Sequence, residues 1–246
     1  MLGTVAVISI MHLALHLSNK PKTAKMANFL PIWKGTKGFE GGYQSLANDS
    51  ANYCPAKGKP GSQLIGTNYG ISALALGDYF HRCPSVAEVK NLTPEMAQRI
   101  AKTEFWDPIQ GDNIKSQAVA HLIFDATYGS GSYGPQQAKK AINKIIGKDT
   151  VPETKTFSLT DREIELINKI PEKQFFKTMF DIRVKFFKGL EYEKGYLNRI
   201  NTILNMYDAA LKSTKKFAMN NVGKIFFAAG VIGLSIGIIM YMRKNK

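Results

Sequence analysis

The sequence is poor in the residues that build metal centres and disulfide frameworks. Its 246 residues include two cysteines and four scattered histidines, which form no ligand cluster and so argue against cysteine–metal chemistry. Cys54 and Cys83 both lie in Pro-containing, loop-like sequence. In an oxidising compartment, a disulfide between them would close the long loop that follows residue 40. Two free thiols are the alternative.

Acidic residues are also few: 19 Asp and Glu stand against 33 Lys and Arg, which gives a net charge of +14 at pH 7. This excess informs about partners more than about fold. No nucleic-acid-binding motif accompanies it, and the lysines are scattered over the predicted helices, so we expect no nucleic-acid partner. Peptidoglycan, teichoic acids and anionic lipid headgroups are other acidic partners. A solvated basic surface is the alternative.

Apolar residues are present in ordinary amounts, 44% of the chain with 11% aromatic, which predicts a globular protein with one medium domain and some additional segments. Helical periodicity dominates the pattern, so we expect a mainly α fold. Thr93 followed by Pro94 indicates the start of a helix that runs to about Phe105. Thr160 and Glu163 form a capping box at the start of another.

Long apolar runs occur only at the two ends of the chain. Residues 1–17 are mostly apolar and residues 18–25 are basic, which is compatible with an export signal or anchor, or with a functional start at Met26. Residues 225–242 are uncharged, and as a helix they would span about 27 Å, close to the thickness of a bilayer core. Basic residues flank this segment on both sides, so we predict a membrane anchor whose orientation stays open.

The stretch Gly38–Tyr43 (GFEGGY) combines a carboxylate with a predicted helix end. Phe29, Ile32, Trp33 and Phe39 recur at helical spacing, and the two glycines after Glu40 are expected to end that helix in the left-handed conformation. The negative end of the helix dipole and the nearby rings both disfavour the charge of the Glu40 carboxyl group. A carboxyl group that stays protonated near neutral pH is suited to general acid catalysis.

Gly38–Tyr43, followed by Thr67–Ser72, Trp106–Asp112 and Phe124–Gly131, resembles the family 108 glycoside hydrolases. These are lysozyme-like peptidoglycan hydrolases of phages and bacteria. The stretch Gly195–Arg199, with Arg183 and Phe187 before it, resembles the peptidoglycan-binding region that often follows in this family.

The resemblance implies a lysozyme-like catalytic domain in which Glu40 is the general acid. Asp49 is a candidate to position water or to stabilise positive charge. Candidate substrate-binding residues are Tyr43, Thr67, Tyr69 and Trp106, although Tyr69 and Trp106 also suit packing roles. No metal or organic cofactor is implied, because acid–base glycoside hydrolysis needs none.

The chain departs from the family pattern in the loop after Glu40, which has an apparent insertion through Cys54 and Pro60, and at Gly129, where Asn is common. These departures leave a non-catalytic wall-binding or structural protein, of a phage particle or secretion apparatus, as the alternative function. A membrane-lytic protein acting through its C-terminal segment is a third reading.

We therefore expect four parts in this chain. They are an apolar and basic N-terminal segment (1–25), a lysozyme-like catalytic domain (26–150), a helical peptidoglycan-binding-like region (151–211) and a basic-flanked transmembrane anchor (212–246). The expected partners are peptidoglycan and, through residues 225–242, a membrane. A wall-cutting domain has to face the wall or periplasm.

Overall fold

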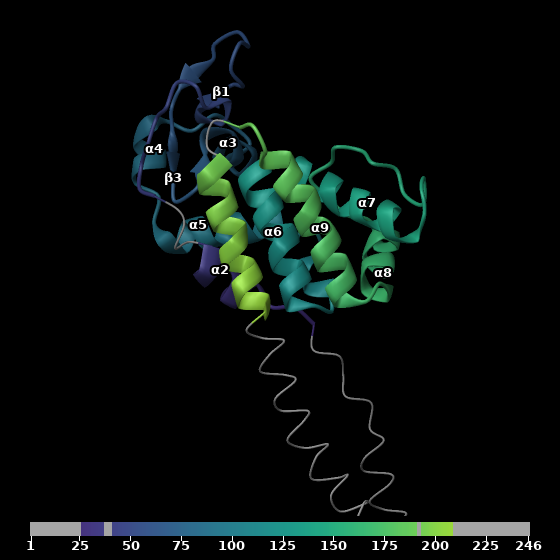
Figure 1. The fold of residues 1–246 in the computed structure, drawn as a ribbon. Coiled ribbons are helices and arrows are strands. Elements are labelled where there is room, and N and C mark those ends of the chain that lie inside the picture. Colours follow the sequence, from purple (N-terminus) through teal and green to yellow (C-terminus); the bar gives the residue numbers. More distant parts are fainter. Residues whose placement is uncertain (1–25, 37–40, 191–192, 209–246) are drawn as a thin grey trace, which may run out of the picture. The chain divides into compact units, whose positions relative to one another are not determined.

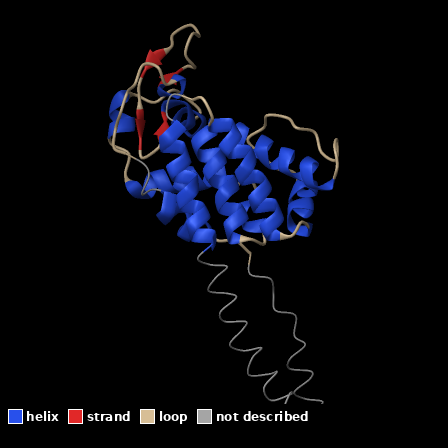
Figure 2. Ribbon diagram, viewed as in Figure 1, coloured by secondary structure: helices blue, strands red, loops and turns tan. Residues whose placement is uncertain are grey.

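A computed structural model describes residues 26–36, 41–190 and 193–208 (Figure 1). The chain divides into two compact units, residues 1–188 and 189–246. The described part is mainly helical, with a few two-residue strands (Figure 2), as the periodicity predicts. The first unit thus continues past the boundary expected at residue 150, and the functional division at that point stays a prediction.

The two terminal segments singled out in the sequence, 1–25 and 225–242, lie outside the described residues. Within the portion of the chain that is described, no helix is both long enough and apolar enough to cross a bilayer.

The helical core consists of α6 (Gln117–Ser130), α7 (Tyr133–Ile146) and α9 (Glu172–Phe187), which pack on one another (Figure 1). Helix α6 is buried continuously from Val119 to Tyr128. It ends at Gly131, which has a positive φ of 57°. The turn into α7 is tight, because a Cβ at Gly134 would lie 2.4 Å from the amide nitrogen of Thr127.

A buried polar network links the three core helices. Arg183 of α9 donates from Nη2 to Oδ2 of Asp125 on α6 at 3.3 Å and from Nη1 to Oε1 of Gln137 on α7 at 3.2 Å. All three side chains are almost fully buried, and the Arg183 guanidinium also lies 4.8 Å from the ring centre of Phe187. Two residues that the resemblance associates with wall binding, Arg183 and Phe187, therefore have a packing role in the first unit.

Capping chemistry sets the starts of the helices around this core. The side chain of Thr93 caps α5 (Pro94–Ala101), and the last turn continues as a π-helical segment, η3 (Lys102–Trp106). Thr160 and Glu163 form the predicted capping box of α8 (Asp161–Lys169). Buried Lys139 of α7 reaches the Glu163 carboxylate at 3.7 Å, which ties α8 to the core.

The loop-rich flank, residues 41–92, contains the remaining short elements. They are η2 (Ser50–Asn52), β1 (Tyr53–Cys54), β2 (Gln63–Leu64), β3 (Thr67–Asn68), β4 (Ile71–Ser72), α3 (Ala73–Phe80) and α4 (Val86–Lys90). Strand β1 pairs antiparallel with β2, and β3 pairs antiparallel with β4. Cys54 and Cys83 form a disulfide with their Cα atoms 5.5 Å apart, which decides between the two alternatives for these cysteines.

In the second unit, residues 193–208 are helical. The stretch Gly195–Arg199 lies within the first turns of this helix.

Candidate active site

Glu40 lies between α2 (Phe29–Thr36) and Gly41, and it falls outside the described residues. The helix before it is anchored by Phe29, Ile32 and Trp33, which are buried as their spacing predicts. Residues 37–40, which precede the two glycines, lie outside the described part of the chain, so the predicted glycine cap stays a prediction. Both glycines have open space where a Cβ would stand.

The chain directly after Glu40 is joined to the β3–β4 hairpin. Gln44 and Thr67 exchange two backbone hydrogen bonds of 2.9 and 2.8 Å, and the Tyr43 hydroxyl donates to the Ile65 carbonyl at 2.8 Å. A Cβ on Gly66, whose φ is 116°, would lie 2.7 Å from the Tyr43 ring. The predicted substrate-binding residues Tyr43 and Thr67 are thus brought together, and Gly66 is what allows the approach.

Asn52 organises the long loop between these segments. Its side chain is fully buried, its Oδ1 accepts from the Thr67 hydroxyl, and its Nδ2 donates to the Leu46 carbonyl at 3.0 Å and to Oε1 of Gln44 at 3.1 Å. Its backbone carbonyl accepts from two further amides, those of Ile65 and Gly66. The sequence reasoning missed this residue, because nothing local distinguishes it from the other polar residues of the loop.

Asp49 caps the helix that contains Asn52. Its Oδ1 accepts a 3.0 Å hydrogen bond from the amide of Ala51 at the start of η2. The side chain is half-buried. One of its carboxylate oxygens is occupied by the hydrogen bond that caps η2. Its assignment as a second catalytic carboxylate stays a prediction.

Tyr69 and Gly70 form the two-residue turn of the hairpin, with φ values of 52° and 76°. Positive φ at both positions is typical of a type I′ turn. The turn is anchored by Tyr128 of α6, whose hydroxyl donates to the Tyr69 carbonyl at 2.7 Å. Tyr69 is therefore at the tip of the hairpin, partly exposed, on the flank that contains Tyr43 and Thr67.

Trp106 is completely buried and belongs to an aromatic cluster with Phe29 and Phe124. Its indole N–H donates to Oδ1 of Asp112 at 2.9 Å, and Gly111 packs so closely on the ring that a Cβ there would lie 2.3 Å from it. The ring offers no open face to a sugar in this structure. Its surroundings fit the packing role that the sequence left as the alternative.

A further carboxylate, Glu104 on η3, was not singled out in the sequence. Desolvation raises its pKa above the ordinary value, the charge of Asp78 raises it further, and His81 offsets part of this effect. Among the described residues, no group of three or more histidine, cysteine or carboxylate side chains is placed to hold a metal ion. Hydrogen bonds on the flank bring the side chains of Gln44, Asn52 and Thr67 together.

A mainly helical unit with a short hairpin region is consistent with the lysozyme-like class of fold. Residues 34–131 match the family model described as Glycosyl hydrolase 108. The resemblance read from the sequence motifs is confirmed over that range.

One solved structure with a similar fold is SagA of Brucella abortus. The two chains are 25% identical and superpose with a TM-score of 0.56, and the match covers 74% of this chain and 94% of the other. No curated protein matches the sequence. The match to SagA extends beyond the length of the family 108 segment.

Gly129, a departure from the family pattern, lies in the last turn of α6. A Cβ at this position would meet nothing within 4 Å. Packing therefore does not require glycine at position 129, and a larger residue would fit there.

Proposed function

We propose that this protein is a peptidoglycan hydrolase of the N-acetylmuramidase type, which cleaves the β-1,4 glycosidic bond of the cell-wall glycan with Glu40 as general acid. The observation that carries the proposal is the family 108 match over residues 34–131, because that segment contains Glu40 together with Tyr43, Thr67 and Tyr69. Peptidoglycan is then the substrate, and no cofactor takes part.

In the proposed reaction, the Glu40 carboxyl group gives its proton to the glycosidic oxygen as the bond to the anomeric carbon breaks. Water then adds to the anomeric carbon and its proton returns to a carboxylate. Asp49 is the candidate to position that water or to stabilise the developing positive charge, through the carboxylate oxygen that does not cap η2. Tyr43 and Thr67, fixed side by side by the Gln44–Thr67 bridge, are the candidate contacts to the sugar.

The structural reason to expect a sugar on this flank is its content of polar groups with an adjacent aromatic ring. Tyr43 is partly exposed, and Lys90 lies over its ring with the ammonium 4.9 Å from the ring centre. Aromatic faces suit the apolar faces of pyranoses, and hydroxyl groups such as that of Thr67 suit their hydroxyls.

The test is release of muropeptides from purified cell walls by the full-length protein. Glu40→Gln, which keeps the shape but cannot donate the proton, is expected to lower the rate by about 10²–10⁴-fold. Glu165→Gln is the matched control, because this exposed glutamate of α8 pairs only with neighbours on its own helix. Asp49→Asn tests the second carboxylate in the same assay.

Full activity of Glu40→Gln would overturn the assignment of the general acid. Binding of the wild-type protein to walls without glycan cleavage would overturn the proposed activity and favour a non-catalytic wall-binding protein. Membrane tethering through residues 225–242 is a separate proposal that rests on sequence alone. It predicts that the full chain sediments with membranes, whereas a chain ending at residue 211 does not.

A further inference from the structure

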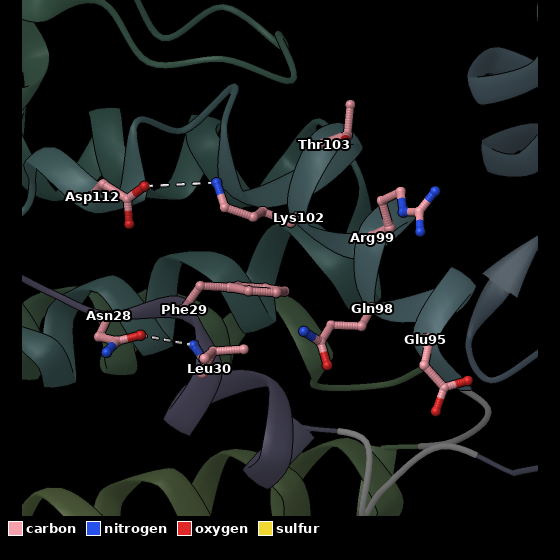
Figure 3. Close-up of a pocket in the computed structure, with 9 residues that line it drawn as sticks. All are labelled: Asn28, Phe29, Leu30, Glu95, Gln98, Arg99, Lys102, Thr103 and Asp112. Atoms are coloured by element: carbon pink, nitrogen blue, oxygen red, sulfur yellow. Dashed lines mark hydrogen bonds and ion pairs between the residues drawn. The ribbon is translucent and has the colours of Figure 1, made fainter. Parts of the chain in front are cut away.

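A pocket of about 570 Å³ lies between the first turn of α2, the outer face of α5 and the π-helical segment η3 (Figure 3). This volume is in the range of small-molecule sites. None of the predicted site residues lines it, and its only family-motif residue is Asp112. The pocket is therefore separate from the hairpin flank that contains Tyr43 and Thr67.

Two cations line the pocket, and they differ in their partners. Lys102 forms an ion pair with Asp107 and lies 3.6 Å from Oδ2 of Asp112, and its hydrogen bond to Asp107 raises its pKa. Arg99 is exposed one turn earlier, and in the described ranges no carboxylate lies within ion-pair distance of it. Figure 3 shows Lys102 reaching toward Asp112 and Arg99 extending away from that pair. The guanidinium of Arg99 is thus the cation available to a ligand.

The neutral polar groups of the pocket are also available. The side-chain amide of Gln98 and the hydroxyl of Thr103 make no hydrogen bond within the described chain. Asn28 uses its Oδ1 to accept from the Leu30 amide at 3.0 Å, which leaves its NH₂ group to donate. Donors and acceptors of this kind match the N–H and C=O groups of peptide bonds.

The remaining walls provide an apolar surface and an acidic end. Leu30 is 48% exposed, and next to it lies the edge of Phe29. Glu95 is one helical turn before Arg99 and forms no ion pair among the residues described. An uncharged glycan could hydrogen-bond to Arg99 and Glu95 but would leave both charges without a counter-charge. A short peptide with free carboxylates, small apolar side chains and an amine would use all of these groups.

We propose that this pocket binds the short, carboxylate-bearing peptide that is attached to the glycan strand of peptidoglycan, with Arg99 as the carboxylate contact. The inference rests on the proposed function, because it deepens the description of the same substrate. Arg99 suits this role since its planar guanidinium can form two parallel hydrogen bonds with one carboxylate. Glu95 is placed to receive the amine of a diamino acid.

The test is a calorimetric titration of the full-length protein with the synthetic tetrapeptide L-Ala–γ-D-Glu–meso-diaminopimelate–D-Ala. Arg99→Gln is expected to weaken binding by about 10-fold or more, because a charge-assisted hydrogen bond pair is lost. The same peptide with its carboxyl groups amidated should bind the wild type with a similar deficit. Arg162→Gln, on the exposed face of α8, is the control that should bind like the wild type.

Absence of tetrapeptide binding, or equal binding by wild type and Arg99→Gln, would overturn the proposal. So would Arg99-dependent binding of chitotetraose without binding of the peptide, since the pocket would then take a neutral glycan. Muropeptide release, measured in parallel, distinguishes a failure of the peptide-binding proposal from a failure of the proposed enzymatic function. If the protein cleaves walls but does not bind the peptide, only the proposal for the pocket is overturned. If it binds the peptide through Arg99 but does not cleave walls, only the proposed enzymatic function is overturned.

Discussion

The loop-rich flank and the helical core belong to the same compact unit, but they are stabilised by different interactions. The core buries an ion pair and large aromatic side chains between long helices, as at Arg183, Phe175 and Phe176. The flank has strands of two residues, one disulfide and a buried amide at Asn52. Four of the five predicted site residues with a described position, Tyr43, Asp49, Thr67 and Tyr69, are on the flank.

The conformation of the flank depends on interactions between nearby residues, whereas that of the core depends on packing between whole helices. Burial of apolar surface stabilises the core without directional requirements. The flank also buries apolar side chains, such as Ile71, Leu76 and Val89, but its short strands and loops depend in addition on a small number of hydrogen bonds with defined partners. Single substitutions should therefore destabilise the core globally and the flank locally, and the following changes test this.

The largest loss of stability is expected for Asp125→Ala. Removing the carboxylate breaks the buried ion pair between Asp125 and the guanidinium of Arg183, which should cost about 3–5 kcal/mol. Urea denaturation of the purified protein measures it. Asp181→Ala, which breaks an exposed pair with Lys177 on the same helix α9, is the control and should cost well under about 1 kcal/mol. Equal losses in the two variants would contradict the role assigned to the buried pair.

Replacement of both cysteines, Cys54→Ser with Cys83→Ser, should cost about 2–4 kcal/mol, because the disulfide closes a 29-residue segment of the unfolded chain. Native-state hydrogen exchange is expected to show faster exchange in the flank, with α6 amides least affected. Uniform loss of protection in both regions would mean that the flank and the core unfold as one unit.

Asn52→Ala should cost about 1–3 kcal/mol, because the Leu46 carbonyl and the Thr67 hydroxyl lose their buried partner. Muropeptide release should also fall, since Tyr43 and Thr67 are positioned through this loop. Asn48→Ala, an exposed neighbour in the same loop, is the matched control. Stability and activity equal to those of the control would show that Asn52 does not organise the flank.

The smallest effect is expected for Glu104→Gln. The raised pKa means that the folded protein holds this proton more tightly than the unfolded chain does, so the charged carboxylate opposes folding at neutral pH. The variant should melt at a higher temperature than wild type near pH 7. This advantage should shrink as the pH falls through the raised pKa and vanish below about 4, the ordinary range of a glutamate.

In the same melting series, Glu165→Gln is expected to change the melting temperature near pH 7 in the opposite direction. The pKa of Glu165 is lowered by its hydrogen bond to Lys169, so its charged form favours the folded state at neutral pH. Its replacement should lower the midpoint slightly near pH 7 and have no effect once the carboxylate is protonated in both states. A shift of the same sign in both variants would contradict the assigned causes.

The features that the sequence predicts correctly are local. Thr93 and Pro94 start α5, and Thr160 with Glu163 starts α8, because a capping side chain bonds to amides only two or three residues away. The apolar spacing of α2 likewise predicts which of its residues are buried, since one face of a helix is set by its own periodicity.

The features that the sequence does not predict depend on residues far apart in the chain. Arg183 and Asp125 are 58 residues apart, so neither signals the other, and the burial of α6 on all sides depends on α7 and α9. Asn52 is unremarkable until its contact with Thr67, 15 residues later, is known. The sequence leaves Trp106 between a sugar contact and a packing role, and the contacts with Phe29 and Gly111 that favour packing come from other parts of the chain.

The hydrogen bond from Tyr128 to the hairpin tip has a consequence for sequence variation. The acceptor is the main-chain carbonyl of Tyr69, while the Tyr128 ring packs against Phe105 and Phe124 of the interior. This hydrogen bond therefore requires the tyrosine side chain at position 128, whereas at position 69 it involves only the backbone. Among relatives with this hairpin, we expect position 128 to stay tyrosine and position 69 to vary among residues that tolerate a positive φ, which is 52° here.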